Sequence, residues 1–361
     1  MTNFVITRIH NHIGFITLDR PKALNSLSLE MIRTLTSTLL EWKDNSDVRA
    51  VFIHSSHERA FCAGGDIRFF YDVGTATPKG DSALLEDFFT EEYALNYLIH
   101  TYPKPYISLL NGVVMGGGMG IAQSTSENQL RIVTERTKMA MPEVNIGLFP
   151  DVGGGYFLSR CAGEIGTYLG LTGEVINAAD AIYAELADVY LPSAQLPALI
   201  QLLETTKESD IRFCLRQFAA PFQSQLGDSQ LASYRDVIDQ HFSHNEVRAI
   251  TSALNSAASP FAQKTYSIMQ TRSPLLMCVT LEQLRRSKHL NIADCLRLER
   301  TMVRHCFKHG EVLEGVRALV VDKDMKPNWQ PADLAKVSDE LIQEFFKPVW
   351  PEYAHPLREL I

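Results

Sequence analysis

The sequence NGVVMGGGMG occupies residues 111–120 and directly follows the apolar run at residues 106–110. A second glycine segment, FCAGGDI, occupies residues 61–67 and comes after the apolar run at residues 50–54. Each segment leads from a predicted buried strand into a predicted helix. Backbone N–H groups at the start of a helix have no partner inside it, and glycine lets a ligand approach them closely. Together the two segments predict paired backbone donors, which is what a developing oxyanion requires.

Other roles for these glycines are weaker. Most glycines in loops serve turns or close packing of the chain. No Gly-Lys-Ser/Thr sequence follows four variable positions, so a nucleoside-triphosphate loop is not indicated. The spacing around Gly116 also does not fit G-x-G-x-x-G, which argues against a dinucleotide fold.

Strand and helix patterns alternate on both sides of the two segments, which predicts α/β units in a largely parallel sheet. Short β-rich runs at the start of the chain predict a hairpin, and helical spacing of apolar residues predicts the first helix. The predicted strands are 4–9, 13–18, 50–54, 106–110, 129–133, 138–141 and 189–191, and the clearest predicted helices are 28–43, 84–102 and 292–308. Residues 55–65 are predicted as a loop.

The second half of the chain has a different pattern. After residue 151 it becomes mainly helical, and residues 325–361 hold several prolines and are expected to wrap the surface. A length of 361 residues fits two domains or one large domain with an extension. We therefore predict a core over 1–192 and a mainly helical region over 193–361 that packs on it.

Composition excludes several classes of protein. Hydrophobic residues are 45% of the chain and charged residues 21%, which is typical of a globular protein. The net charge of -8 disfavours nucleic acid as a partner. The longest apolar stretch, 106–122, contains five glycines and is too short for a membrane span. Six scattered cysteines and no leader pattern predict a reducing compartment, the cytoplasm.

Two acidic residues lie between apolar neighbours, Glu143 and Asp151. Burial raises the pKa of a carboxyl group, which suits acid–base chemistry near neutral pH. Asp151 could equally cap the helix that follows it. His305 and His309 share a helix face, but no third ligand is suggested, so we expect no metal site.

Several of these segments resemble the crotonase superfamily, also called the enoyl-CoA hydratase/isomerase superfamily. The resemblance is carried by AGGDI at 63–67, by the glycines of 111–118, and by Glu143 after a proline. Longer strings resemble the 3-hydroxyisobutyryl-CoA hydrolases within that superfamily, namely FFTEEY at 88–93 and IGLFPDVGGGYFL at 146–158. The resemblance implies a repeated ββα spiral core with a helical C-terminal region, and an acyl-CoA ligand.

The resemblance also implies roles for the glycine segments. The N–H groups of Gly65 and Gly117 would bind the thioester oxygen, with Ala63 and Gly64 beside the ligand. No separate cofactor is implied, since coenzyme A is part of the substrate. Relatives of this kind often form trimers or hexamers, so a homo-oligomer is expected.

For the acids, the resemblance implies that Glu143 is catalytic, Asp151 is a second acid and Glu92 lies in the substrate pocket. Typical hydratases carry a catalytic glutamate where this chain has Gly120. We therefore expect hydrolysis of 3-hydroxyisobutyryl-CoA, or a similar short β-hydroxyacyl-CoA, as in valine breakdown. Glu143 would either attack the carbonyl or activate water. The alternatives are an enoyl-CoA hydratase or isomerase and a non-catalytic acyl-CoA-binding protein.

Overall fold

The computed structural model describes residues 4–77, 82–123 and 128–361. Packing divides the chain into two compact units, each assembled from three stretches of sequence. The first unit comprises Met1–Gly65, Leu95–Ala140 and Val175–Ala232, and the second comprises Asp66–Ala94, Met141–Glu174 and Ser233–Ile361. The predicted division of the chain at residue 192 stays a prediction.

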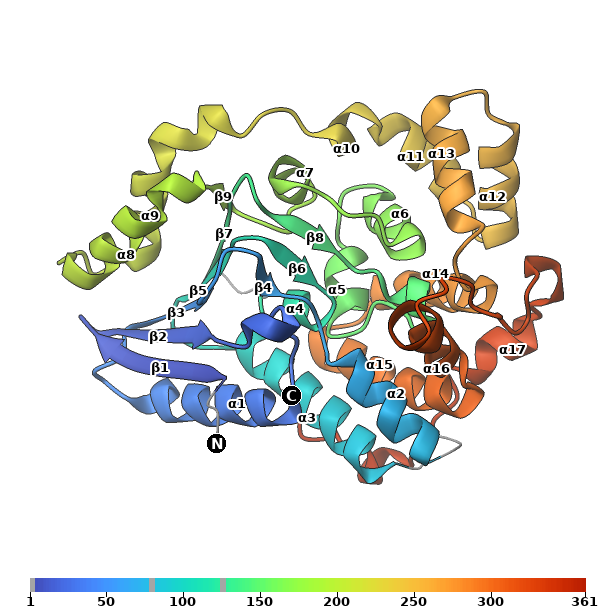
Figure 1. The fold of residues 1–361 in the computed structure, drawn as a ribbon, viewed down its shortest axis with the longest axis horizontal. Helices are drawn as coiled ribbons and strands as arrows, with labels where there is room; N and C mark the ends of the chain where they lie inside the picture. The colour runs from blue at the N-terminus through green and yellow to red at the C-terminus, as the bar shows by residue number, and fades with distance from the viewer. Residues whose placement is uncertain (1–3, 78–81, 124–127) are drawn as a thin grey trace. The chain divides into compact units, whose positions relative to one another are not determined.

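The first unit contains the main sheet, which has six strands in the described part of the chain (Figure 1). The strands follow the order β1-β2-β3-β5-β7-β9. β1 and β2 form the predicted antiparallel hairpin, and every later pair is parallel. The bounds are β1 (Val5–His10), β2 (Ile13–Leu18), β3 (Ala50–Ser55), β5 (Tyr106–Leu110), β7 (Gln129–Val133) and β9 (Val189–Tyr190). The largely parallel sheet predicted from the sequence is confirmed.

Helices cover both faces of this sheet, which explains why its strands read as continuous apolar runs. Alternate strand residues such as Phe15 and Phe52 pack with α8 (Leu196–Thr205) and α9 (Ile211–Ala219). Gly14 points to the opposite face, where α1 (Leu29–Asp44) lies, and a Cβ there would be 2.3 Å from the Trp42 ring. That contact leaves room only for glycine.

A second, smaller sheet carries the glycine segments. It has three parallel strands in the described residues, β4 (Ala60–Cys62), β6 (Val113–Met115) and β8 (Lys138–Ala140). The predicted loop over 55–65 is therefore wrong, because β4 lies within it. Likewise, β6 separates the strand at 106–110 from the helix α4 (Gly117–Gly120). Three residues are too short to show the alternation by which a strand is detected.

The element order shows how the two sheets are built. The chain repeats two strands followed by a helix, as β1-β2-α1, then β3-β4-α2 and β5-β6-α4. From the second repeat on, the first strand joins the large sheet and the second strand joins the small one. This arrangement confirms the predicted repeated ββα core.

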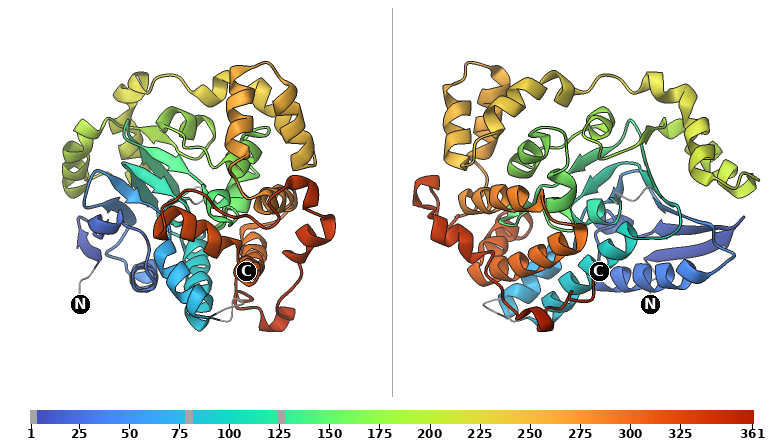
Figure 2. Two further views of the ribbon diagram at one scale, coloured as in Figure 1. Left: turned by 45° about the vertical axis from the view of Figure 1, so that its right-hand side comes forward. Right: turned by 180° about the vertical axis from the view of Figure 1, so that it is seen from behind.

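The second unit is helical in its described residues (Figure 2). Its α14 (Pro274–Ser287) and α15 (Ile292–His309) both pack against α5 (Gly154–Leu158). α15 confirms the amphipathic helix predicted at 292–308; Asn291 caps its start through the Asp294 N–H, and Gly310 ends it in the left-handed conformation. The predicted helix after it is divided into α16 (Glu311–Val316) and a π-helical turn (Arg317–Val321).

The remaining elements are shorter or lie toward the ends of the units. They are η1 (Pro21–Ala23), α2 (Ile67–Ala76), α3 (Ala83–His100), η3 (Glu143–Ile146), α6 (Ile165–Thr172), α7 (Ala178–Tyr183), η4 (Ser193–Gln195), η5 (Ala220–Gln225), α10 (Gln230–Ser233), α11 (Arg235–Phe242), α12 (Val247–Ser256), α13 (Pro260–Met269), η7 (Leu334–Lys336), α17 (Asp339–Glu344) and η8 (Glu352–Ala354). Among the described residues, no helix combines the length and the apolar character needed to cross a membrane.

Candidate active site

In the first unit, the two glycine segments lie side by side. Gly64 has a φ of +104°, and a Cβ there would be 3.2 Å from the Met115 carbonyl oxygen and 3.6 Å from the Gly117 nitrogen. A Cβ on Gly118 would be 2.3 Å from the Cys62 carbonyl oxygen. Any side chain at these positions would push the two segments apart. The structure therefore brings together the segments whose pairing the sequence predicts.

The backbone of both segments is held from several directions. Gly65 forms a parallel bridge with Leu27, whose N–H donates to the Gly64 carbonyl at 2.8 Å. The fully buried Asn25 side chain donates to the Phe61 carbonyl at 3.0 Å. Gly117 is the first residue of α4, so its N–H has no acceptor one turn earlier within that helix. The roles of Gly65 and Gly117 as donors to a ligand remain predictions.

In the second unit, four carboxyl groups are buried. Glu92 lies on α3, Glu143 begins η3, and Asp151 lies in the turn before α5. Glu299, on α15, was not among the residues predicted from the sequence. The exposed fractions of these residues are 2% for Glu92, 5% for Glu143, 5% for Asp151 and 0% for Glu299. Buried acids are expensive unless they are paired or protonated, so this cluster is a candidate for chemistry.

Glu143 is positioned by a short turn of helix. It follows Pro142, and Gly147 ends the turn with a φ of +70°. The Glu143 carbonyl accepts from the Leu148 N–H at 3.0 Å. Its Oε2 atom is buried and has no hydrogen-bond partner among the described residues. Burial raises the pKa of Glu143 well above its usual range, and the negative charge of Asp151 raises it further.

Asp151 has a partner that the sequence did not reveal. The Tyr93 hydroxyl donates to Asp151 Oδ2 at 2.7 Å. Burial raises the pKa of Asp151 to about 6, although the Tyr93 hydrogen bond acts in the opposite direction. The N-cap of α5 is Gly153 and receives no side-chain cap, so the alternative that Asp151 caps this helix is wrong.

Glu92 is one residue before Tyr93 on the same helix. Its Oε1 atom is buried without a hydrogen-bond partner in the described part of the chain. Burial raises the pKa of Glu92 well above its usual value, and the charge of Asp151 adds to the shift. Like charges this close do not ionise together easily, so the cluster retains a proton near neutral pH.

Glu299 receives hydrogen bonds on both oxygens from the turn that follows Asp151. Oε2 accepts from the Gly153 N–H at 2.8 Å and Oε1 accepts from the Gly155 N–H at 2.9 Å. Burial raises the pKa of Glu299 to about 8, while these two N–H bonds lower it. A signal for it existed in the sequence, because it lies on the apolar face of an amphipathic helix, four residues after Cys295 and three before Met302.

No metal site is evident. Among residues 4–77, 82–123 and 128–361, no three His, Cys, Asp or Glu side chains are arranged to hold a metal ion. A ring nitrogen of His305 lies 2.8 Å from the Lys347 carbonyl oxygen, and His309 packs against Phe345. The expectation that no metal is needed stays a prediction.

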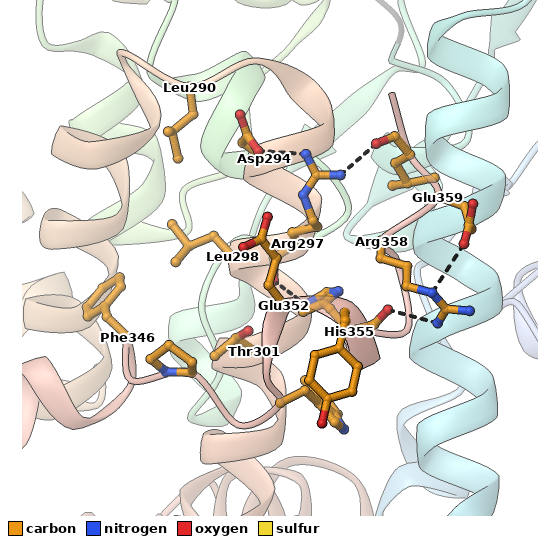
Figure 3. A pocket seen from close by; sticks show the side chains of 14 residues that line it. Leu290, Asp294, Arg297, Leu298, Thr301, Phe346, Glu352, His355, Arg358 and Glu359 are labelled. Carbon is orange, nitrogen blue, oxygen red and sulfur yellow. Dashed lines mark hydrogen bonds and ion pairs between the residues drawn. The ribbon is translucent and has the colours of Figure 1, made fainter.

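A cavity of about 940 Å³ lies between α15 and the C-terminal segment of the second unit (Figure 3). Arg297 lines it but donates to Asp294 at 2.7 Å and to the Leu360 carbonyl at 2.7 Å. Arg358 pairs with Glu359 at 3.1 Å. The four buried carboxyl groups do not line this cavity, and its arginines already have partners.

Comparison with known proteins places this chain in a family. The family model described as enoyl-CoA hydratase/isomerase matches residues 13–346. A curated relative from Gallus gallus, "3-hydroxyisobutyryl-CoA hydrolase, mitochondrial", is 38% identical over 93% of this chain and 86% of its own length. The predicted cytoplasmic location remains a prediction, since that name refers to the relative.

Two solved structures share the fold closely. One is described as a carnitinyl-CoA dehydratase from Mycobacterium thermoresistibile, with a TM-score of 0.89 and 37% identity over 97% of this chain and 98% of that one. The other is described as an enoyl-CoA hydratase from Rhodobacter sphaeroides, with a TM-score of 0.84 and 35% identity over 96% and 98%. The predicted resemblance to 3-hydroxyisobutyryl-CoA hydrolases is confirmed, and the chain belongs to the enoyl-CoA hydratase/isomerase family.

Proposed function

We propose that this protein is an acyl-CoA thioester hydrolase that converts 3-hydroxyisobutyryl-CoA, or a similar short β-hydroxyacyl-CoA, to the free acid and coenzyme A. The observation that carries the proposal is the pairing of two buried acids, Glu143 and Asp151, each with a raised pKa. Similarity to relatives named 3-hydroxyisobutyryl-CoA hydrolase over about nine-tenths of the chain supports it.

The carbonyl chemistry is assigned to Glu143. Its ionised carboxylate either attacks the thioester carbon to form an anhydride, which water then cleaves, or removes a proton from the attacking water. In both cases the C–S bond breaks, a C–O bond forms, and the sulfur leaves with the bonding electrons. The unpartnered Oε2 atom of Glu143 supports this role, because no protein group competes for it among the described residues.

The leaving sulfur needs a proton, and the acid cluster supplies one. Because neighbouring buried carboxyl groups do not all ionise together, Asp151 or Glu92 holds a proton while Glu143 is ionised. That proton passes to the sulfur of coenzyme A. The charge that develops on the thioester oxygen is assigned to the N–H groups of Gly65 and Gly117, each worth about 10²–10³ in rate.

The β-hydroxyl group of the substrate is assigned to Glu92 and Asp151. Glu92 Oε1 is a buried acceptor without a partner among the described residues, and such an atom is costly unless a ligand satisfies it. A hydroxyl donor at this position would satisfy it. Acyl chains without the hydroxyl would leave the atom unpaired and should react more slowly.

A second candidate function is hydration of an unsaturated acyl-CoA. It is favoured by the descriptions of the two solved structures as a dehydratase and a hydratase. Against it, position 120 in α4 is a buried glycine, where hydratases that resemble this chain carry a glutamate. Without that carboxylate, one of the two groups that direct water to the double bond is missing.

The deciding assay follows coenzyme A release from 3-hydroxyisobutyryl-CoA with a thiol-reactive dye, alongside the absorbance of crotonyl-CoA. We expect rapid thiol release and stable crotonyl absorbance. Loss of that absorbance without thiol release would indicate the hydratase. Saturable binding with neither reaction would indicate a non-catalytic acyl-CoA-binding protein.

We also propose that the reaction needs no separate cofactor, because thioester hydrolysis consumes only water. Dialysis against a chelator should leave the rate unchanged. The cytoplasmic location and a trimeric or hexameric assembly stay predictions, and light scattering would measure the assembly.

A further inference from the structure

We propose that Glu299 is a positioning residue that holds the Asp151 turn in the geometry needed for turnover. The inference rests on the proposed function of Asp151 in thioester hydrolysis. Glu299 is fully buried and is hydrogen-bonded to the backbone of the turn that follows Asp151, so its effect on the reaction is indirect.

The contact between Glu299 and this turn is two-pronged. Its two carboxylate oxygens accept from two different backbone donors, the N–H groups of Gly153 and Gly155, at 2.8 and 2.9 Å. The acceptor comes from α15, more than 140 residues later in the chain. A carboxylate with one donor on each oxygen fixes both the distance and the orientation of the backbone it binds.

The turn needs such an external hold because its backbone is strained. Val152 has a φ of +53° and Gly153 a φ of +87°. A β-branched residue rarely occupies the left-handed region, and it persists there only where the surroundings impose it. The adjacent α5 has no side-chain cap at its N-cap residue, so Glu299 supplies acceptors that the local sequence lacks.

A second residue holds the other side of Asp151. Gln283, on α14, donates from Nε2 to the Pro150 carbonyl at 2.8 Å and to Glu299 Oε1 at 3.2 Å. The backbone is thus bound immediately before Asp151 and again two residues after it. The packing is also tight, since a Cβ on Gly155 would lie 2.6 Å from Ser287 Oγ.

These contacts leave the Asp151 carboxyl group with a defined position opposite the Tyr93 hydroxyl. A shift of about 1 Å in a reacting group can cost about 10² in rate. Glutamine has nearly the same shape as glutamate but only one acceptor oxygen. Its amide NH₂ would face a backbone N–H donor, so Glu299→Gln breaks one prong without removing side-chain volume.

The test compares Glu299→Gln with Glu311→Gln. Glu311 is also a buried acid of the second unit, and it accepts from the Gln330 N–H at 2.8 Å and from the Ser273 hydroxyl. We expect kcat for 3-hydroxyisobutyryl-CoA to fall about 10²-fold in Glu299→Gln with KM within threefold, and to stay near wild type in Glu311→Gln. Circular dichroism and thermal melting establish that both variants are folded.

Two results in active enzyme would overturn the proposal. One is an unchanged kcat in Glu299→Gln. The other is an equal loss in both variants, which would mean that any buried acid of this unit has the same effect. If Glu299→Gln does not fold, Gln283→Met replaces it; that variant removes the amide bonds to Pro150 and Glu299, and a kcat equal to wild type would likewise overturn the proposal.

Failure of the proposed function gives a different pattern, in which wild-type protein releases no thiol. Hydrogen–deuterium exchange then decides the inference alone. We expect the amides of the segment 151–158 to exchange at least tenfold faster in Glu299→Gln and at the wild-type rate in Glu311→Gln. Unchanged exchange in Glu299→Gln would show that Glu299 does not hold the turn.

Discussion

The two units of this protein prepare chemistry in opposite ways. The first unit offers backbone N–H groups in two glycine segments, where the useful feature is the absence of side chains. The second unit offers four buried carboxyl groups, where the useful feature is the side chain itself. Backbone donors need only a rigid frame, whereas buried acids resist ionisation and oppose folding at high pH. The difference predicts that changes in the two units will fail in different ways.

The largest effect is expected from Glu143→Gln. Removing a general base typically costs about 10²–10⁴ in rate, and removing a nucleophile costs more, up to about 10⁶. Coenzyme A affinity should stay within a few fold of wild type, since the side-chain volume is unchanged. Single-turnover thiol release and calorimetric binding measure the two quantities. Full turnover in this variant would remove Glu143 from the mechanism.

The next largest effect is expected from Gly64→Ala in the first unit. The new Cβ would meet the Met115 carbonyl at 3.2 Å and strain a backbone with a φ of +104°, so the two glycine segments should separate. We expect kcat to fall about 10²–10³-fold, as for loss of an oxyanion donor. Gly227→Ala is the matched control, because Gly227 has a φ of +77° with nothing within 4 Å. An equal loss of kcat in the control would contradict this explanation.

A smaller effect is expected from Tyr93→Phe. The Tyr93 hydroxyl lowers the pKa of Asp151 against the effect of burial, so its removal should raise that pKa above about 6. The acidic limb of the pH–kcat profile should move to higher pH, and kcat at pH 7 should fall roughly tenfold, or about 1.4 kcal/mol. A profile that coincides with wild type would separate Asp151 from the acidic limb.

The smallest effect is on stability, and it has the opposite sign. Burial raises the pKa of Glu92 above its value in the unfolded chain, so the folded protein loses stability as pH rises between the two values. Glu92→Gln does not titrate and should be more stable than wild type at pH 8, by roughly 1–3 kcal/mol, and less so at pH 5. Urea denaturation at both pH values measures this. Glu359→Gln, at a side chain that is 84% exposed, is the control and should show no such trend.

Much of the first unit could be predicted from the sequence, because long apolar runs and glycine segments are local signals. The hairpin, the parallel strands and the adjacency of the glycine segments follow from such signals. β4 and β6 could not be predicted, because three residues are too few to show a period.

The second unit was predicted less completely because its contacts join distant parts of the chain. Asp151 and Glu143 stand out among apolar neighbours, but the bond from Tyr93 to Asp151 spans 58 residues. The bond from Glu299 to Gly153 spans 146 residues. A helix face can suggest that a residue is buried, but not which backbone group it will meet.

The position of water's oxygen in the product tests the central claim most directly. Wild-type protein would turn over 3-hydroxyisobutyryl-CoA many times in ¹⁸O-labelled water, and mass spectrometry would locate the label. Hydrolysis predicts free coenzyme A and an acid whose carboxylate carries ¹⁸O while its hydroxyl group does not. Label in the β-hydroxyl group, with the thioester intact, would contradict hydrolysis and show that the protein adds and removes water at a double bond.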